Sequence, residues 1–138
     1  LARELGVADR VRFAGFVQPA DLPRWFAAAD AFVLPSHAEG WGVVVPEAMA
    51  AGLPVLASER VNAAADLVRD GVCGWRFPVG GHAALAGRMA ELCAEPARLA
   101  ELGAAAREAV RDEAPGPAAR RMVRLLEAAQ GRQPLAGI

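Results

Sequence analysis

The sequence contains no lysine at all, and each of its 15 basic residues is an arginine. These are balanced by 16 acidic residues, so the formal net charge is only −1. A nearly neutral chain lacks the basic surface of nucleic-acid-binding domains, so we expect no nucleic-acid partner. Together with the abundance of alanine, the exclusive use of arginine is typical of GC-rich coding and indicates a bacterial source.

Cysteines are few, and long hydrophobic runs are missing. Cys73 and Cys93 are far apart and form no C-x-x-C pair, so we predict two small buried thiols. No cluster of His, Cys and Asp has the spacing of metal ligands, so we expect no metal site. No apolar run approaches the ~18 residues that a membrane span needs. We therefore expect a cytoplasmic globular domain.

Short apolar runs alternate with amphipathic stretches along the chain, which has 138 residues and is 54% hydrophobic. This alternation favours βαβ units, so we predict an α/β fold: a Rossmann-like parallel sheet flanked by helices, with a helical C-terminal segment. Strands are expected at residues 11–14, 31–34, 54–57 and 73–79. Helices are expected after Asp21 and at residues 43–51, 63–69, 83–94, 97–113 and 118–129.

Apolar stripes on three of these helices predict which side chains face the core. The stripes are Leu22, Trp25, Phe26 and Ala29; Leu85, Met89 and Leu92; and Leu99, Leu102, Ala106 and Val110. Asp21 is expected to cap the first of these helices, whose first turn holds Pro23. The domain is expected to span residues 1–130, and the Gly/Pro-containing tail 131–138 to fray.

The chain starts at Leu1 instead of methionine. Residues 1–6 are typical of the last turn of a helix, with Gly6 as the C′ residue that stops it. A sequence that begins inside an element is typical of a piece of a longer protein, so we expect further chain upstream.

The segment 35–58 contains the residues that carry chemistry. A buried strand is expected to end at Leu34, and a glycine-containing loop leads from it to a helix near Val43. In open α/β sheets, ligands bind beyond the carboxyl ends of the strands, where such loops meet helix N-termini. Gly40 and Gly42 leave room for a ligand beside backbone N–H groups, and the helix dipole favours a phosphate there.

Two carboxylates flank this turn. Glu39 lies in the loop, and Glu47 lies in the first helical turn, just after Pro46. A carboxylate only accepts hydrogen bonds, so it suits the hydroxyl groups of a sugar or a ribose. Glutamate is also favoured in the first turn of a helix for electrostatic reasons alone. The spacing by itself therefore leaves a purely structural role open for both residues.

This stretch resembles the E-x7-E signature of glycosyltransferase family 4, a large family of retaining GT-B glycosyltransferases. The residues that carry the resemblance are Pro35-Ser36, Glu39-Gly40-Trp41-Gly42, Glu47-Ala48-Met49-Ala50, Gly52 and Pro54-Val55. Further similarity extends over roughly residues 1–102. The resemblance implies the C-terminal, nucleotide-sugar-binding half of a GT-B fold, without the N-terminal domain that binds the acceptor.

By the same resemblance, the signature holds a nucleotide-diphosphate sugar, the donor substrate. Glu39 is implied to contact hydroxyls of the donor sugar and is the candidate catalytic residue, while Glu47 is implied to bind the ribose hydroxyls. Val43 is implied to add an amide at the helix start. The backbone that is implied to line the sugar and the diphosphate belongs to Gly40, Trp41 and Gly42.

The loop after residues 54–57 departs from the family pattern. The family usually has Gly-Gly-x-x-Glu there, whereas this chain has Asn62-Ala63-Ala64-Ala65-Asp66, so its preference for nucleotide or sugar is open to change. Asn62 either caps the following helix or reaches the ligand. Arg60 either assists at the diphosphate or is a solvated surface residue. His37 either touches the acceptor or is simply exposed. The family's diphosphate-binding Arg/Lys pair lies upstream of this chain.

The resemblance implies transfer of a sugar from the donor to a hydroxyl group, with retention of the anomeric configuration and without a metal or other cofactor. The acceptor, a lipid, saccharide or small molecule, would bind the missing N-terminal domain, so the fragment alone is expected to be inactive. Peripheral association of the whole protein with the inner membrane face stays open. Two alternatives also stay open: a GT-B-fold nucleotide-sugar epimerase, and a non-catalytic nucleotide-sugar-binding partner module.

Overall fold

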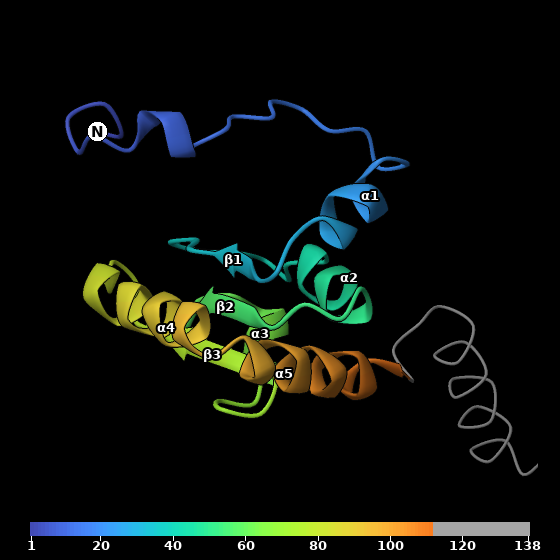
Figure 1. Ribbon diagram of the computed structural model, residues 1–138. Helices are drawn as coiled ribbons and strands as arrows, with labels where there is room; N and C mark the ends of the chain where they lie inside the picture. Colours follow the sequence, from blue (N-terminus) through green and yellow to red (C-terminus); the bar gives the residue numbers. More distant parts are fainter. Residues whose placement is uncertain (112–138) are drawn as a thin grey trace, which may run out of the picture.

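Three short strands form a parallel sheet in the order β1-β2-β3 (Figure 1). They are β1 (Phe32–Leu34), β2 (Val55–Ser58) and β3 (Gly74–Phe77). The register pairs Val33 with Leu56, and Leu56 in turn with Trp75. The computed structural model describes residues 1–111, so the helix predicted at 118–129 and the tail predicted at 131–138 lie outside the described residues.

Helices connect these strands and cover the sheet. Within the described range they are α1 (Leu22–Ala27), α2 (Val44–Ala50), α3 (Asn62–Leu67), α4 (His82–Ala94) and α5 (Pro96–Ala109). A further short 3-10 helix, η1 (Ala8–Arg10), lies on the N-terminal arm away from the sheet (Figure 1) and buries no residue. The order β1-α2-β2-α3-β3-α4 is the alternation that the sequence predicted. The predicted α/β fold, a parallel sheet flanked by helices, is therefore confirmed.

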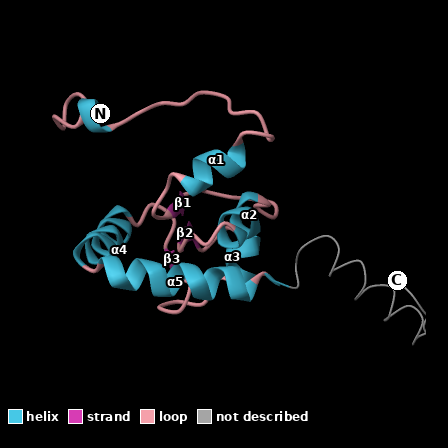
Figure 2. Cartoon of the chain, turned by 45° about the vertical axis from the view of Figure 1, so that its right-hand side comes forward, coloured by secondary structure: helices cyan, strands magenta, loops and turns pink. Residues whose placement is uncertain are grey.

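The core has two parts, one on each face of the sheet. Because side chains alternate along a strand, Val55 and Ala57 of β2 point to one face and Leu56 points to the other. Figure 2 shows α4 on one side of the sheet and α2 with α3 on the other. Helix α5 packs into both parts, with Leu102 beside Leu56 and Ala106 in the opposite cluster.

Helix α2 ends in a Schellman motif. Gly52 has a φ of 87°, its N–H donates to the Met49 carbonyl, and the N–H of Leu53 donates to the Ala48 carbonyl. Glycine adopts this left-handed conformation without strain, so Gly52 stops the helix as predicted. The same arrangement of bonds surrounds Gly6, whose φ is 67°, and confirms its predicted place at the end of a helical turn.

The strand predicted at residues 11–14 is not part of the described sheet. Val11 has extended backbone angles, but the segment runs apart from β1 as an arm (Figure 1), and the Phe13 side chain is 90% exposed. An extended segment becomes a strand only where a neighbour completes its hydrogen-bond ladder, and no described strand pairs with residues 11–14. For the same reason β1, which pairs only with β2 in the described range, is half-buried and not buried on both faces.

Two of the predicted core stripes are narrower than expected. Trp25 on α1 and Met89 on α4 are exposed, because each helix packs through a single strip centred on Phe26 and Leu92, respectively. Ala29 lies beyond the end of α1 and is exposed as well. The Phe26 ring packs edge-on against Phe32 of β1 at a centroid distance of 6.0 Å. Peripheral helices therefore bury less than their periodicity predicts.

The prediction that Asp21 caps α1 is right in position but wrong about the capping hydrogen bond. Asp21 occupies the N-cap position, and Pro23 lies in the first turn as expected. The Asp21 side chain makes no capping hydrogen bond, because the residue has helical backbone angles. A capping side chain reaches the free N–H groups from an extended backbone, so the helical conformation of Asp21 excludes that contact.

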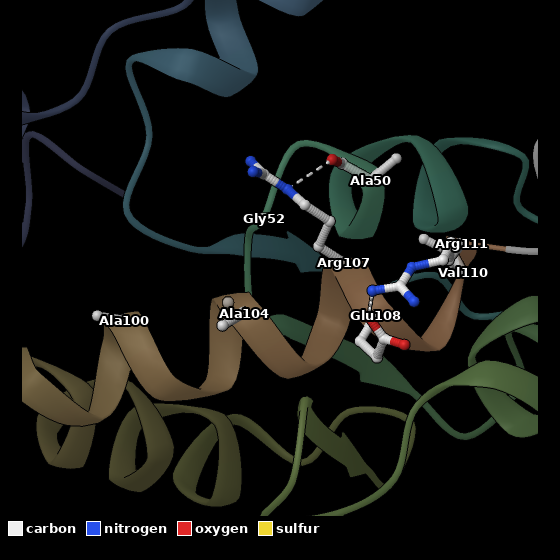
Figure 3. Close-up of a pocket in the computed structure, with 9 residues that line it drawn as sticks. Ala50, Gly52, Ala100, Ala104, Arg107, Glu108, Val110 and Arg111 are labelled. Atoms are coloured by element: carbon white, nitrogen blue, oxygen red, sulfur yellow. Dashed lines mark hydrogen bonds and ion pairs between the residues drawn. The ribbon is translucent and has the colours of Figure 1, made fainter.

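The C-terminal end of α2 is held by α5. Arg107 donates from Nε to the Ala50 carbonyl at 3.2 Å and from Nη2 to the Ala51 carbonyl at 2.9 Å. Figure 3 shows this side chain reaching from α5 across a surface pocket of about 630 Å³ towards α2. A Cβ atom on Gly103 would lie 2.2 Å from the Gly52 carbonyl oxygen, so the two backbones approach closely here. Arg107 thus satisfies carbonyls that a helix end leaves without partners.

Arg107→Ala is expected to lower the free energy of unfolding by about 1–2 kcal/mol, because two charge-assisted hydrogen bonds to the end of α2 are lost. Arg111→Ala is the matched control, since among residues 1–111 the Arg111 side chain pairs only with the exposed Glu108, and its loss should cost less than about 0.5 kcal/mol. Urea denaturation monitored by tryptophan fluorescence measures both changes. Equal losses for the two variants would show that α5 does not secure α2 through Arg107.

Candidate functional site

Two loops meet at the carboxyl edge of the sheet. The first joins β1 to α2 over residues 35–43, and the second joins β2 to α3 over residues 59–61. Because β1 and β2 are adjacent and parallel, both loops leave the sheet at the same edge. Ligands of open α/β sheets bind at this edge. The structure therefore brings the predicted loop and the predicted helix start to the place where ligand binding is expected.

Backbone hydrogen bonds tie the two loops together. The N–H of Glu39 donates to the Arg60 carbonyl at 3.2 Å, and Glu39 forms a parallel bridge with Val61. The N–H of Ala63 donates to the Trp41 carbonyl at 2.8 Å. These contacts join residues about 20 positions apart, so the loop that carries Glu39 is fixed from the side of α3.

Two side chains add to this connection. Ser58 Oγ, buried at the end of β2, donates to the Ser36 carbonyl. Asn62 Nδ2 donates to the Gly40 carbonyl at 2.7 Å. The N-cap residue of α3 is Val61, and no side chain caps that end of the helix. The capping role considered for Asn62 is therefore wrong, and its amide supports the loop instead.

The backbone N–H groups from Gly40 to Val44 form a run of free donors. Within residues 1–111 none of them donates a hydrogen bond. The carbonyls of the first three residues are occupied, by Asn62, Ala63 and Val45 in turn. Because α2 starts at Val44, the positive end of its dipole adds to the field of these N–H groups. The arrangement suits a negatively charged group such as a phosphate.

Gly42 permits the close approach of the first loop to the second. Its φ is 91°, and a Cβ atom there would lie 2.9 Å from Cγ1 of Val61 and 3.3 Å from Cγ of Glu39. Glycine alone combines this backbone angle with this lack of space. At Gly40, two residues earlier, a Cβ atom would meet open space. Crowding therefore requires glycine at position 42 and does not require it at position 40.

Gly42→Ala is expected to lower the free energy of unfolding by about 2–3 kcal/mol. The left-handed backbone is strained for alanine, and the added methyl group meets the buried Val61 side chain. Gly40→Ala is the matched control and should change stability by less than about 1 kcal/mol. Thermal and urea unfolding of both variants check this. A Gly42→Ala variant as stable as the control would contradict the crowding at Gly42.

The two predicted carboxylates occupy different environments. Glu39 is half-buried between the loops, whereas Glu47 is exposed on α2. Glu47 borders an apolar pocket of about 510 Å³ between α1 and α2. The rest of its lining is Pro19, Leu22, Pro23, Phe26, Ala27, Ala50 and Ala51. This pocket was not predicted, because it forms where α1 and α2 pack together, and the local sequence pattern does not indicate that contact.

The remaining candidates lie in the same two loops with their side chains in solvent. Trp41 is 45% exposed, and Val43, the N-cap residue of α2, is exposed beside it. His37 is exposed in the first loop. The Arg60 side chain is exposed in the second, while its carbonyl accepts from Glu39. All of these residues are thus free to contact a ligand at this edge.

Metal ligands and membrane-spanning helices are not found in the described part of the chain. Among residues 1–111, no three His, Cys, Asp or Glu side chains gather where a metal ion could bind. Over the same residues, no helix combines the length and apolarity needed to cross a membrane.

The prediction of two buried thiols is right for Cys73 and wrong for Cys93. On a helix, neighbouring residues point about 100° apart, so the buried Leu92 leaves Cys93 in solvent.

Known sequences resemble this chain over most of its length. The profile of a family described as "Glycosyl transferases group 1" matches residues 1–109. D-inositol 3-phosphate glycosyltransferase 2 of Catenulispora acidiphila is 45% identical over 105 residues, which are 75% of this chain and 24% of that protein. A D-inositol 3-phosphate glycosyltransferase of Streptomyces scabiei is 45% identical over 108 residues, or 77% and 24% of the two chains. The chain therefore spans about a quarter of the length of these relatives.

Solved structures share the fold. Sucrose-phosphate synthase from Thermosynechococcus elongatus matches with a TM-score of 0.77 and 34% identity, over 93% of this chain and 33% of that one. Anabaena HepE in complex with UDP matches with a TM-score of 0.81 and 29% identity, over 92% and 35% of the two chains. The parallel sheet and its flanking helices thus match part of the GT-B fold of these proteins.

Proposed function

Because this chain belongs to the group 1 glycosyl transferases, we propose that it is the donor-binding half of a retaining GT-B glycosyltransferase of family 4. The whole protein would move a sugar from a nucleoside diphosphate to a hydroxyl group and keep the anomeric configuration. The observation that carries the proposal is the run of free N–H groups from Gly40 to Val44, preceded in the chain by Glu39 and followed by Glu47.

We assign each part of the donor to residues of the loop after β1, of α2 and of the pocket beside it. The N–H groups from Gly40 to Val44 suit the diphosphate, because they are free and lie at the start of α2. Glu39 accepts hydrogen bonds from the sugar hydroxyls, and Glu47 accepts them from the ribose. The apolar pocket beside Glu47 suits a flat base. Anabaena HepE, similar in fold, was solved with UDP and with UDP-glucose, which supports a nucleotide sugar as the donor.

The reaction breaks the bond between the anomeric carbon and the diphosphate oxygen, and forms a bond from that carbon to the acceptor oxygen. The proton of the acceptor hydroxyl passes to the leaving diphosphate, so the products are a glycoside and a nucleoside diphosphate. The N–H groups of the loop stabilise the negative charge that develops on the diphosphate, and Glu39 orients the sugar. Arg60, exposed in the adjacent loop, adds positive charge near the same group. No resident metal or cofactor takes part in this scheme.

The acceptor belongs to the other half of the protein in this proposal. The relatives named for D-inositol 3-phosphate match this chain over only 24% of their length, so we assign acceptor recognition to the part outside the match. His37, exposed in the first loop, is the residue of this chain that we assign to the acceptor side. A lipid acceptor would bring the whole protein to the inner face of the membrane.

Calorimetry of the intact protein with UDP and GDP tests the donor site, and binding of one of them is expected. Product analysis by NMR with the matching nucleotide sugar then separates the candidate functions. A new glycoside with the anomeric configuration of the donor supports the transferase. An altered nucleotide sugar indicates the epimerase, and binding without turnover indicates the partner module. Failure to bind either nucleotide contradicts the proposal.

A further inference from the structure

We propose that Asn62 is a positioning residue that fixes the direction of a peptide group in the loop after β1, so that the N–H of Trp41 faces the donor. This role rests on the proposed donor site and assigns a specific task to a side chain at the start of α3. It differs from helix capping, which the structure excludes for Asn62, and from direct contact with the ligand.

The hydrogen bonds of two consecutive peptide groups support this role. The Gly40 carbonyl accepts from Asn62 Nδ2 at 2.7 Å, and the Trp41 carbonyl accepts from the N–H of Ala63 at 2.8 Å. In a trans peptide the C=O and the following N–H point in opposite directions. Because both carbonyls face the start of α3, the N–H groups of Trp41 and Gly42 face away from α3. These N–H groups are free donors within residues 1–111.

The two peptide groups are not held equally well. The Trp41 carbonyl is fixed by a backbone donor that every residue except proline supplies at position 63. The Gly40 carbonyl depends on one side chain, and Gly40 itself has open space where a Cβ would lie. Glycine permits a wide range of backbone angles, so the peptide between Gly40 and Trp41 can rotate once Asn62 releases it.

Rotation of this peptide would reverse the electrostatics of the loop at one point. The Trp41 N–H would turn towards α3, and the Gly40 carbonyl oxygen would turn towards the donor. A carbonyl oxygen beside a diphosphate repels it, whereas an N–H attracts it. Asn62 therefore matters for the phosphate part of the ligand and has no comparable effect on the nucleoside part, which we assign to the region of Glu47.

Asn62→Asp is the sharpest variant. The amide group faces the Gly40 carbonyl with its nitrogen, because an acceptor needs a donor opposite it. Aspartate has the same shape but offers only oxygen atoms, so it repels the carbonyl and favours the rotated peptide. Asn62→Ala removes the hydrogen bond without repulsion. Arg69→Ala, exposed beyond the end of α3, is the control on the same segment.

The test compares a nucleoside diphosphate with its nucleoside in the intact protein. Calorimetry gives the Kd of UDP or GDP, whichever the wild type binds, and competition gives the Kd of uridine or guanosine. We expect Asn62→Asp to raise the Kd of the diphosphate by about tenfold and Asn62→Ala by a smaller factor. The Kd of the nucleoside and the melting temperature should stay unchanged in both, and Arg69→Ala should behave as wild type.

Several outcomes would overturn this role. A wild-type Kd for the diphosphate in Asn62→Asp would show that Asn62 does not control the loop. An equal loss for diphosphate and nucleoside would show a general structural defect. Should Asn62→Asp fail to fold, a wild-type Kd in a folded Asn62→Ala would also refute it. If the wild type binds neither UDP nor GDP, the proposed donor site itself fails, which the same titrations reveal before any variant is compared.

Discussion

Glu47→Gln is expected to weaken the binding of UDP or GDP by about tenfold to a hundredfold, whereas Glu39→Gln should leave the affinity for the free nucleotide unchanged. In the proposed site Glu47 accepts hydrogen bonds from the ribose, which every nucleotide carries. Hydrogen bonds to a charged group are worth about 1.5–3 kcal/mol, and glutamine replaces one acceptor oxygen by a donor. Calorimetry with the free nucleotide measures this difference between the two acids.

For binding of the sugar part of the donor, we expect the larger effect from Glu39→Gln and not from Glu47→Gln. Glu39→Gln should weaken the binding of the matching nucleotide sugar relative to that of the free nucleotide and lower kcat by about a hundredfold, because in the proposed site Glu39 orients the transferred sugar. Glu101→Gln is the control, since Glu101 is an exposed acid on α5 whose ion-pair partner in the described part of the chain is Arg98. If both variants lose affinity for the free nucleotide to the same extent, the separate roles of Glu39 and Glu47 are wrong.

Gly74→Ala should prevent folding. A Cβ atom on Gly74 would lie 2.0 Å from the carbonyl oxygen of Val55 and 2.8 Å from its backbone nitrogen, and the φ of Gly74 is 152°. These are main-chain atoms of the central strand β2, which cannot move without breaking the pairing with β3. We expect a loss of more than about 4 kcal/mol, which exceeds the effect of most single substitutions.

Two other glycines serve as graded controls for Gly74→Ala. Gly80 has a φ of 72° but open space around its Cβ position, so Gly80→Ala should cost about 1–2 kcal/mol through backbone strain alone. Gly87 lies inside α4 with open space and no positive φ, so Gly87→Ala should be neutral or slightly stabilising. Soluble yield and urea unfolding rank the three. A well-folded Gly74→Ala variant would contradict the close approach of β3 to β2.

The parts of the fold that depend on local chemistry could be predicted from the sequence. Helix α2 was placed to within a residue or two at each end. Its apolar residues are followed by Gly52, and glycine is the residue that most often ends a helix in the left-handed conformation. The buried strand β2 was clear from its continuous apolar run. The loop between β1 and α2 was clear as well, because glycines and polar residues separate these two elements.

The parts that depend on distant partners could not be predicted. Residues 11–14 carry a strand pattern, but a pattern does not show whether a neighbour is present. Asparagine is a residue type that often caps helices, yet the Asn62 amide donates a hydrogen bond to the carbonyl of Gly40, 22 positions earlier. The apolar pocket beside Glu47 likewise needs α1 and α2 to be packed together. The carboxylates were identified through a resemblance, and their roles in binding stay predictions.

The hydrogen bonds between the two loops use only atoms of the protein itself. Ser36, Glu39 and Gly40 on one side are bonded to Ser58, Arg60 and Asn62 on the other. The two loops are therefore preorganised. A ligand that binds there does not have to order them first, so less conformational entropy is lost on association. Such a site should capture its substrate at a rate set by diffusion and orientation, not by a slow rearrangement of these loops.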